Sequence, residues 1–207
     1  MCGIVGYNGA RPVTDFLLDA LELLEYRGYD SAGLATINAE TGRTKLRKCA
    51  GRVADLRKVC ENDKKQATCG IGHTRWATHG GVSDENAHPH RQGNVLLVHN
   101  GIVENYEELR DHFMLSKDLK SETDTEVVAG VLNRYYDGDP HKAIAQTVKH
   151  LKGTFALVII FDDIPDVIYA IRNVSPIVAA RTEDGTMLAS DVAALGSHAT
   201  EYMVVPE

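Results

Sequence analysis

Apolar residues recur at helical spacing through much of the first 150 residues. The segment RPVTDFLLDALELLEYRG (11–28) carries one such stripe, which predicts an amphipathic helix packed on a core. The same spacing predicts helices over 54–61, 103–115, 124–136 and 140–151. Asp139 and Pro140 suit the cap and the first position of the last helix. The stripe of the first helix consists of Val13, Phe16, Leu17, Ala20, Leu21 and Leu24.

Strand-like segments surround these helices. GLATIN (33–38) and TKLRKC (44–49) flank a turn at Thr41 and Gly42, so they predict a hairpin. ATCGIGHTR (67–75) and NVLLVHN (94–100) predict two strands separated by a polar loop over 77–93, and Asn100-Gly101 is typical of a turn. After residue 152 five strands follow in succession. Helices first and serial strands later predict an α+β fold with antiparallel sheet.

Composition and charge exclude several classes of protein. The chain has 207 residues, 43% of them hydrophobic, which is enough for one domain with a real core, or two small ones. Its net charge is −7 and its basic residues are scattered, so we expect no nucleic-acid partner. The longest apolar run, 155–161, is far shorter than the roughly 20 residues of a membrane helix, and no leader precedes the fold. We therefore expect a cytoplasmic protein without membrane contact.

The four cysteines form no CxxC pair, which argues against a zinc ribbon or a dithiol redox motif. Cys49 and Cys69 lie in strand-like segments, and Cys60 shares a helical face with Val53, Leu56 and Val59, so these three are expected to be structural. Cys2 has two interpretations. It is either a small buried hydrophobe or, once Met1 is removed, an amino-terminal nucleophile.

Histidines supply a rival hypothesis. His88 and His90 are one residue apart, and His73, His79 and His99 could join them in a metal site of a metallohydrolase. Arg91 follows directly, and its guanidinium would repel a dication. We therefore expect no metal.

Side chains elsewhere in the chain suit an amino-terminal nucleophile. The α-amine of such a cysteine has a pKa of about 7.7–8.0 and can act as its general base near neutral pH. Asn100 and Gly101 could donate to an oxyanion, Arg75 suits a carboxylate, and Asp124 suits an ammonium. Together these groups fit an amino acid substrate that carries a carbonyl further along its side chain.

In this context the chain resembles the amino-terminal glutaminase domain of the glucosamine-6-phosphate synthase family, within the class II, N-terminal-nucleophile amidotransferases. The likeness extends over nearly the whole chain, through MCGIVGY, EYRGYDSAG, HTRWATHG, NAHPH, VHNGIVEN and SETDTEV in that order. The opening CGI indicates the class alone. EYRGYDSAG, HTRWATHG and SETDTEV are more specific for the hexosamine enzymes.

The resemblance implies a four-layer αββα sandwich, no cofactor, and hydrolysis of L-glutamine through a γ-glutamyl thioester on Cys2. It implies an oxyanion hole of Asn100 and Gly101, with Arg75 on the α-carboxylate and Asp124 on the α-amino group. It places further residues at the glutamine pocket, and Arg27 near the nucleophile. The pocket residues implied are Trp76, Thr78, His79 and His88.

The family's two sugar-isomerase subdomains, which bind fructose 6-phosphate, are missing from residues 1–207. We therefore expect a glutaminase domain that is a piece of a longer, homodimeric enzyme and that is itself compatible with a monomer. A retained Met1 would convert the amine of Cys2 into an amide and leave the thiol without its base. A non-catalytic glutamine-binding module is the alternative hypothesis.

Overall fold

Two antiparallel β-sheets form the centre of the protein. The computed structural model describes residues 2–38, 40–63, 66–77, 80–199 and 201–207. The first sheet has seven strands, in the order β11 (Tyr202–Val204), β9 (Val178–Thr182), β10 (Gly185–Ala189), β1 (Gly3–Gly9), β4 (Cys69–Arg75), β2 (Ser31–Ile37) and β3 (Thr44–Ala50). The second has four, in the order β5 (His90–Gln92), β6 (Val95–Val103), β7 (Gly153–Phe161) and β8 (Ile164–Asn173).

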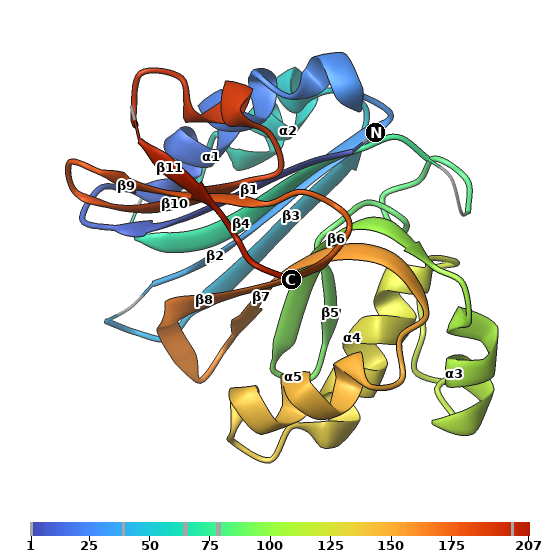
Figure 1. Cartoon of the computed structure of the whole chain (residues 1–207). Coiled ribbons are helices and arrows are strands. Elements are labelled where there is room, and N and C mark those ends of the chain that lie inside the picture. The colour runs from blue at the N-terminus through green and yellow to red at the C-terminus, as the bar shows by residue number, and fades with distance from the viewer. Residues whose placement is uncertain (1, 39, 64–65, 78–79, 200) are drawn as a thin grey trace.

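Helices cover the outer face of each sheet (Figure 1). The seven-stranded sheet carries α1 (Val13–Glu22) and α2 (Val53–Cys60), and the four-stranded sheet carries α3 (Tyr106–His112), α4 (Asp124–Tyr135) and α5 (Pro140–Val148). Short 3-10 turns lie at η1 (Glu25–Arg27) and η2 (Val192–Leu195). The layers are therefore α, β, β and α, and the predicted α+β sandwich is confirmed.

Three apolar cores hold these layers together. One lies between α1, α2 and the first sheet, and a second between α3–α5 and the second sheet. The third joins the two sheets. Alternation along the strands produces this arrangement, because successive side chains point to opposite faces. The third core includes Ile4, Ile71, Leu96, Val98 and Val158.

The first strand of the chain lies inside the first sheet. β1 pairs with β4 on one side and with β10 on the other, so its backbone is hydrogen-bonded along both edges. The side chains of Ile4 and of its cross-strand partner His73 are fully buried. Cys2 directly precedes β1, so its backbone is held by the middle strand of the seven-stranded sheet.

A glycine on β2 allows a loop to approach the sheet closely. A Cβ atom at Gly33 would lie 2.2 Å from the carbonyl oxygen of His88. Since no real Cβ tolerates that distance, only glycine lets the segment before β5 pack there. The His88 ring then stacks on His73, the residue paired with Gly33, with ring centroids 4.2 Å apart.

The structure corrects three expectations. Asn100 and Gly101 do not form a turn, because β6 continues to Val103 with both residues paired to β7. The long polar loop contains the short strand β5. Cys60 is buried on α2 as expected, but Val59 is 46% exposed. Among the described residues no helix has both the length and the apolar character needed to cross a bilayer.

Candidate active site

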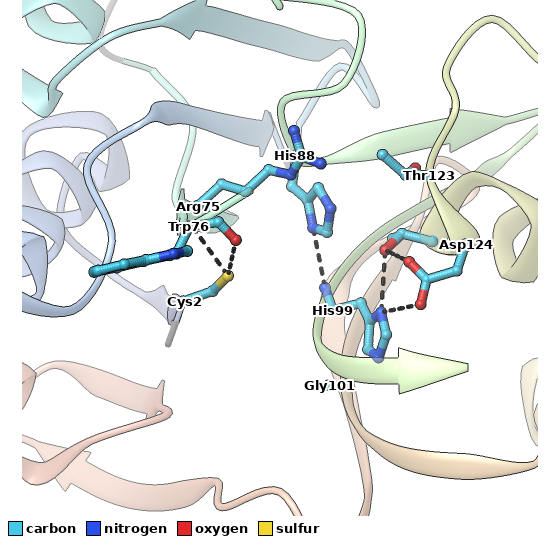
Figure 2. Close-up of a pocket in the computed structure, with 9 residues that line it drawn as sticks. Cys2, Arg75, Trp76, His88, His99, Gly101, Thr123 and Asp124 are labelled. Carbon is cyan, nitrogen blue, oxygen red and sulfur yellow. Dashed lines mark hydrogen bonds and ion pairs between the residues drawn. The ribbon is translucent and has the colours of Figure 1, made fainter. Parts of the chain in front are cut away.

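A pocket lies where the two sheets and the amino-terminal end of α4 meet. Figure 2 shows Cys2 and Trp76 on one side of it and Thr123 and Asp124 on the other, with His88 between them. Five separate segments contribute to its wall. The lining residues are Cys2, Arg75, Trp76, His88, His99, Gly101, Thr123, Asp124 and Thr125.

The Cys2 thiol contacts the backbone at the end of β4. Its sulfur accepts a hydrogen bond from the Trp76 N–H at 3.2 Å and lies 3.5 Å from the Trp76 carbonyl oxygen. Burial raises the pKa of Cys2, while the Trp76 backbone and the positive charge of Arg75 oppose that rise. The thiol therefore holds its proton at neutral pH, and its attack on a substrate needs a base.

Arg75, the last residue of β4, is 4% exposed. Its guanidinium donates to the carbonyl oxygens of Gly81 at 3.1 Å and Gly80 at 3.4 Å. These neutral acceptors are weaker partners than a carboxylate, which can take two N–H groups of one guanidinium at once. An anion entering the pocket thus has a charged group to bind.

Asp124 begins α4 and is 5% exposed. Its Oδ2 accepts from the Val103 N–H at 2.9 Å and lies 3.7 Å from His99 Nδ1, and its Oδ1 accepts from Thr125 Oγ1 at 3.3 Å. These contacts hold a carboxylate at the pocket wall. A cation at this wall would meet a negative charge.

Asn100 and Gly101 adjoin the nucleophile segment from the second sheet. The side-chain nitrogen of Asn100 donates to the Cys2 carbonyl oxygen at 3.0 Å. Gly101 has φ 128°, and a Cβ atom there would lie 2.0 Å from the Thr154 carbonyl oxygen. Glycine is therefore required at this position of β6, whose backbone borders the pocket.

The histidines of the rival metal hypothesis form a buried ring cluster. The ring of His88 stacks on His73 and lies edge-on to His90, and burial lowers the pKa of all three well below its ordinary value. His88 Nδ1 lies 3.4 Å from the His99 N–H, and His90 Nε2 lies 3.0 Å from Thr123 Oγ1. Within the described ranges, no group of three or more His, Cys, Asp or Glu side chains is placed to hold a metal ion.

The remaining predicted residues are distributed unevenly. Arg27 is buried and forms an ion pair with Asp191 at 2.7 Å, and its charge acts on the Cys2 thiol. Trp76 lines the pocket but is 46% exposed. Thr78 and His79 lie outside the residues that the structure describes.

Sequence reasoning gave no pocket role to His99, Thr123 or Thr125. His99 is predicted above only as a candidate metal ligand. Thr123 caps α4, where its Oγ1 accepts from the Glu126 N–H at 3.2 Å. Their position in the sequence, next to Asn100 or Asp124, is the one signal that could have identified them. Residues adjacent to a site residue on a strand or at a helix start often line the same pocket. His99 Nδ1 and Thr125 Oγ1 are 3.1 Å apart.

Comparison with known proteins defines the class. Residues 73–197 match a family described as the glutamine amidotransferase domain. The chain belongs to this glutamine amidotransferase family. It is 42% identical to a glutamine–fructose-6-phosphate aminotransferase (isomerizing) of Clostridium acetobutylicum and 46% identical to one of Symbiobacterium thermophilum. Both alignments cover 100% of this chain and 34% of the relative, so the chain spans about a third of their length.

Solved structures share the fold. A glutamine phosphoribosylpyrophosphate amidotransferase from Bacillus subtilis matches 98% of this chain and 44% of its own, with a TM-score of 0.83 and 23% identity. A glutamine aminotransferase class-II domain protein from Silicibacter pomeroyi matches 91% of this chain and 88% of its own, with a TM-score of 0.64 and 20% identity. The four-layer sandwich is therefore the fold of known amidotransferases.

Proposed function

We propose that this chain hydrolyses L-glutamine to glutamate and ammonia, with Cys2 as the nucleophile. The observation that carries the proposal is the arrangement of three groups in one pocket: the thiol before β1, a guanidinium at the end of β4 and a carboxylate at the start of α4 all line it. Glutamine has a carboxylate, an ammonium and a side-chain amide that match these three groups. Membership of the amidotransferase family supports the same substrate.

The two charged walls would orient the substrate. Arg75 binds the α-carboxylate in place of the carbonyl groups of Gly80 and Gly81, and Asp124 binds the α-ammonium. With both charged groups on Cα held, the other end of the substrate, its side-chain amide, extends toward Cys2. Trp76 and His88 complete the wall, and Thr78 and His79 remain predicted contacts of the glutamine.

The reaction follows from the protonated state of the thiol. The α-amine of Cys2, free after removal of Met1, takes the thiol proton as the sulfur attacks the amide carbon. Asn100 and the Gly101 N–H stabilise the resulting oxyanion. The C–N bond then breaks, and the amine returns the proton to the departing ammonia. Water cleaves the thioester, which releases glutamate and restores the thiol.

The contacts of the Cys2 sulfur are consistent with the α-amine of Cys2 as the base. In the described part of the chain, the Cys2 sulfur has hydrogen-bond contacts with the Trp76 backbone and none with an imidazole. His73 and His88 are poor bases, because burial lowers the pKa of both rings. Arg27, held by Asp191, would act on the acidity of the nucleophile through its charge.

The longer relatives extend the proposal. Their names join glutamine to fructose 6-phosphate, so we propose that residues 1–207 are the glutaminase domain of such an enzyme. The ammonia would then be used to make glucosamine 6-phosphate in further domains that bind fructose 6-phosphate. The full-length enzyme would act in the cytoplasm and would be a homodimer.

The test is glutamate and ammonia release from glutamine by protein whose first residue is shown to be cysteine by intact mass. We expect steady turnover, single labelling at Cys2 by a glutamine-analogue diazoketone, and no turnover by Cys2→Ala. Turnover by Cys2→Ala, or labelling at another residue, would overturn the proposal. Glutamine binding without turnover in correctly processed protein would instead identify a non-catalytic binding module.

A further inference from the structure

His73 lies behind the pocket, between the two sheets, and has no role in the function proposed above. It is fully buried on β4, and its side chain faces β6 of the other sheet. Its Nε2 is 3.1 Å from the His99 carbonyl oxygen and 3.1 Å from Asn100 Oδ1. The ring therefore contacts the same side chain that contacts Cys2.

The surrounding groups determine which ring nitrogen of His73 carries hydrogen. A backbone carbonyl can only accept, so Nε2 must be the N–H that donates to His99. Nδ1 has no hydrogen-bond partner within the described part of the chain. A bare lone pair at Nδ1 is less costly there than an unpaired N–H would be. Burial also lowers the pKa of His73 to about 3, which keeps the ring neutral at physiological pH.

The tautomer of His73 in turn determines the orientation of the Asn100 amide. Since Nε2–H is a donor, the Asn100 atom facing it must be the oxygen. The amide nitrogen then faces the nucleophile segment, where it donates to the Cys2 carbonyl oxygen at 3.0 Å. The opposite orientation would set an NH₂ group against an N–H and an oxygen against the Cys2 carbonyl.

We infer that His73 is a positioning residue that fixes the side-chain amide of Asn100 with its N–H groups toward Cys2. The inference rests on the proposed function, in which Asn100 donates to the oxyanion. One N–H is used by the Cys2 carbonyl, and the rigid amide plane sets the direction of the second. His73 does not touch the substrate and acts only through Asn100. A preorganised donor avoids reorientation at the moment of reaction.

Three variants at position 73 separate a hydrogen-bonding role from a packing role. His73→Gln places an N–H the same number of bonds from Cα as Nε2, His73→Asn places it at the level of Nδ1, and His73→Phe keeps the stacked ring without an N–H. We expect His73→Phe and His73→Asn to lower kcat about 10- to 100-fold with KM within about twofold, because a misplaced oxyanion donor affects the transition state. His73→Gln should recover most of kcat.

A double-mutant cycle adds a readout that a structural role would not produce. If His73 acts through Asn100, His73→Phe should have little further effect on kcat in an Asn100→Ala background. His141→Phe, at an exposed histidine on α5, is the control for histidine replacement. Full additivity, or a wild-type kcat for His73→Phe, would overturn the inference.

Nitrogen NMR of the wild-type protein tests the same inference without a variant. We expect His73 to be the neutral Nε2–H tautomer at every pH from 5 to 8, and an Nδ1–H tautomer would overturn the inference. The two proposals fail in different ways. Wild-type protein with no glutaminase activity refutes the proposed function, whereas an active wild type with normal His73→Phe turnover refutes only the role of His73.

Discussion

Lys48, near the candidate active site, shows how burial acts on a single charged residue. Its side chain is partly buried on β3, and its ammonium donates to the Glu85 carbonyl oxygen at 2.8 Å. Burial lowers the pKa of Lys48 to about 8, although the carboxylates of Glu126, Glu85 and Asp84 act in the opposite direction. Desolvation thus outweighs three nearby negative charges.

The pKa of Lys48 predicts a pH-dependent stability. Its folded pKa of about 8 is below its ordinary value of 10.5, so between these values the unfolded chain binds more protons. Stability therefore rises with pH across this interval, and the cost of burying the charge is fully present below pH 8. We expect Lys48→Met to lack this rise.

Urea denaturation at several pH values from 7 to 10.5 tests this. As the pH rises, the unfolding free energy of the wild type should increase relative to that of Lys48→Met. Lys149→Met, at the exposed C-cap residue of α5, controls for the loss of a lysine. Parallel pH profiles for wild type and Lys48→Met would contradict the expectation.

At the scale of elements, the start of α4 connects the pocket to its supporting loops. Thr123 caps the helix, and its hydroxyl also lies 3.0 Å from His90 Nε2 and 3.0 Å from Ser121 Oγ. One turn later, the buried carboxylate of Glu126 accepts from the Lys120 and Ser121 N–H groups. The helix therefore holds the loop before it and positions Asp124 between two anchored residues.

The cap predicts a graded loss of stability. Thr123→Ala removes the hydroxyl that accepts from the Glu126 N–H and contacts His90, so the free energy of unfolding should fall by about 1–2 kcal/mol. Thr123→Ser retains the hydroxyl and should lose less than half as much. Chemical denaturation monitored by circular dichroism measures both. Equal losses for alanine and serine would show that the methyl group, and not the cap, provides the stability.

Sequence patterns predicted most elements but not the path of β6. The stripe of α1 and the cap of α5 are local signals, and these helices begin where expected, although α1 ends at Glu22 and α5 at Val148, a few residues early. Asn100-Gly101 has the composition of a turn, yet the strand continues, because Gly101 adopts a positive φ while both residues stay paired with β7. That outcome depends on a neighbour more than 50 residues away, which no local pattern reveals.

At the scale of the whole molecule, the site exists only where segments distant in sequence meet. From the sequence, Cys2, Arg75 and Asp124 were each predicted as a candidate site residue. That all three act on one glutamine molecule was implied by the family resemblance. The pocket brings all three together. The histidine and threonine contacts behind them depend on packing across the two sheets, so the sequence alone does not predict them.

The sheet order predicts that residues 178–207 are required for the first strand to fold. β10 provides one edge partner of β1, and the Ile4 N–H donates to Ser190 Oγ at 2.9 Å. A chain that ends before residue 178 would lack β9, β10 and β11 and leave β1 as an exposed edge. We expect such a truncated chain to aggregate and to show no glutaminase activity.

Size-exclusion chromatography and amide hydrogen exchange of the truncated chain test this expectation. Exchange at residues 3–9 should be slow in the 207-residue chain and fast in the truncated one. A truncated chain that is soluble, protects those amides and turns over glutamine would show that β10 is dispensable.

The distance between β1 and β10 along the chain also has a consequence for protein synthesis. The hydrogen bond from Ile4 to Ser190 spans 186 positions, so at about 5–20 residues per second Ile4 is synthesised roughly 9 to 37 seconds before its partner exists. During that interval the start of the chain is accessible to an aminopeptidase. Under the proposed function, completion of the fold and exposure of the reactive amine would follow a fixed order: the nascent chain is trimmed first and its pocket closes afterwards.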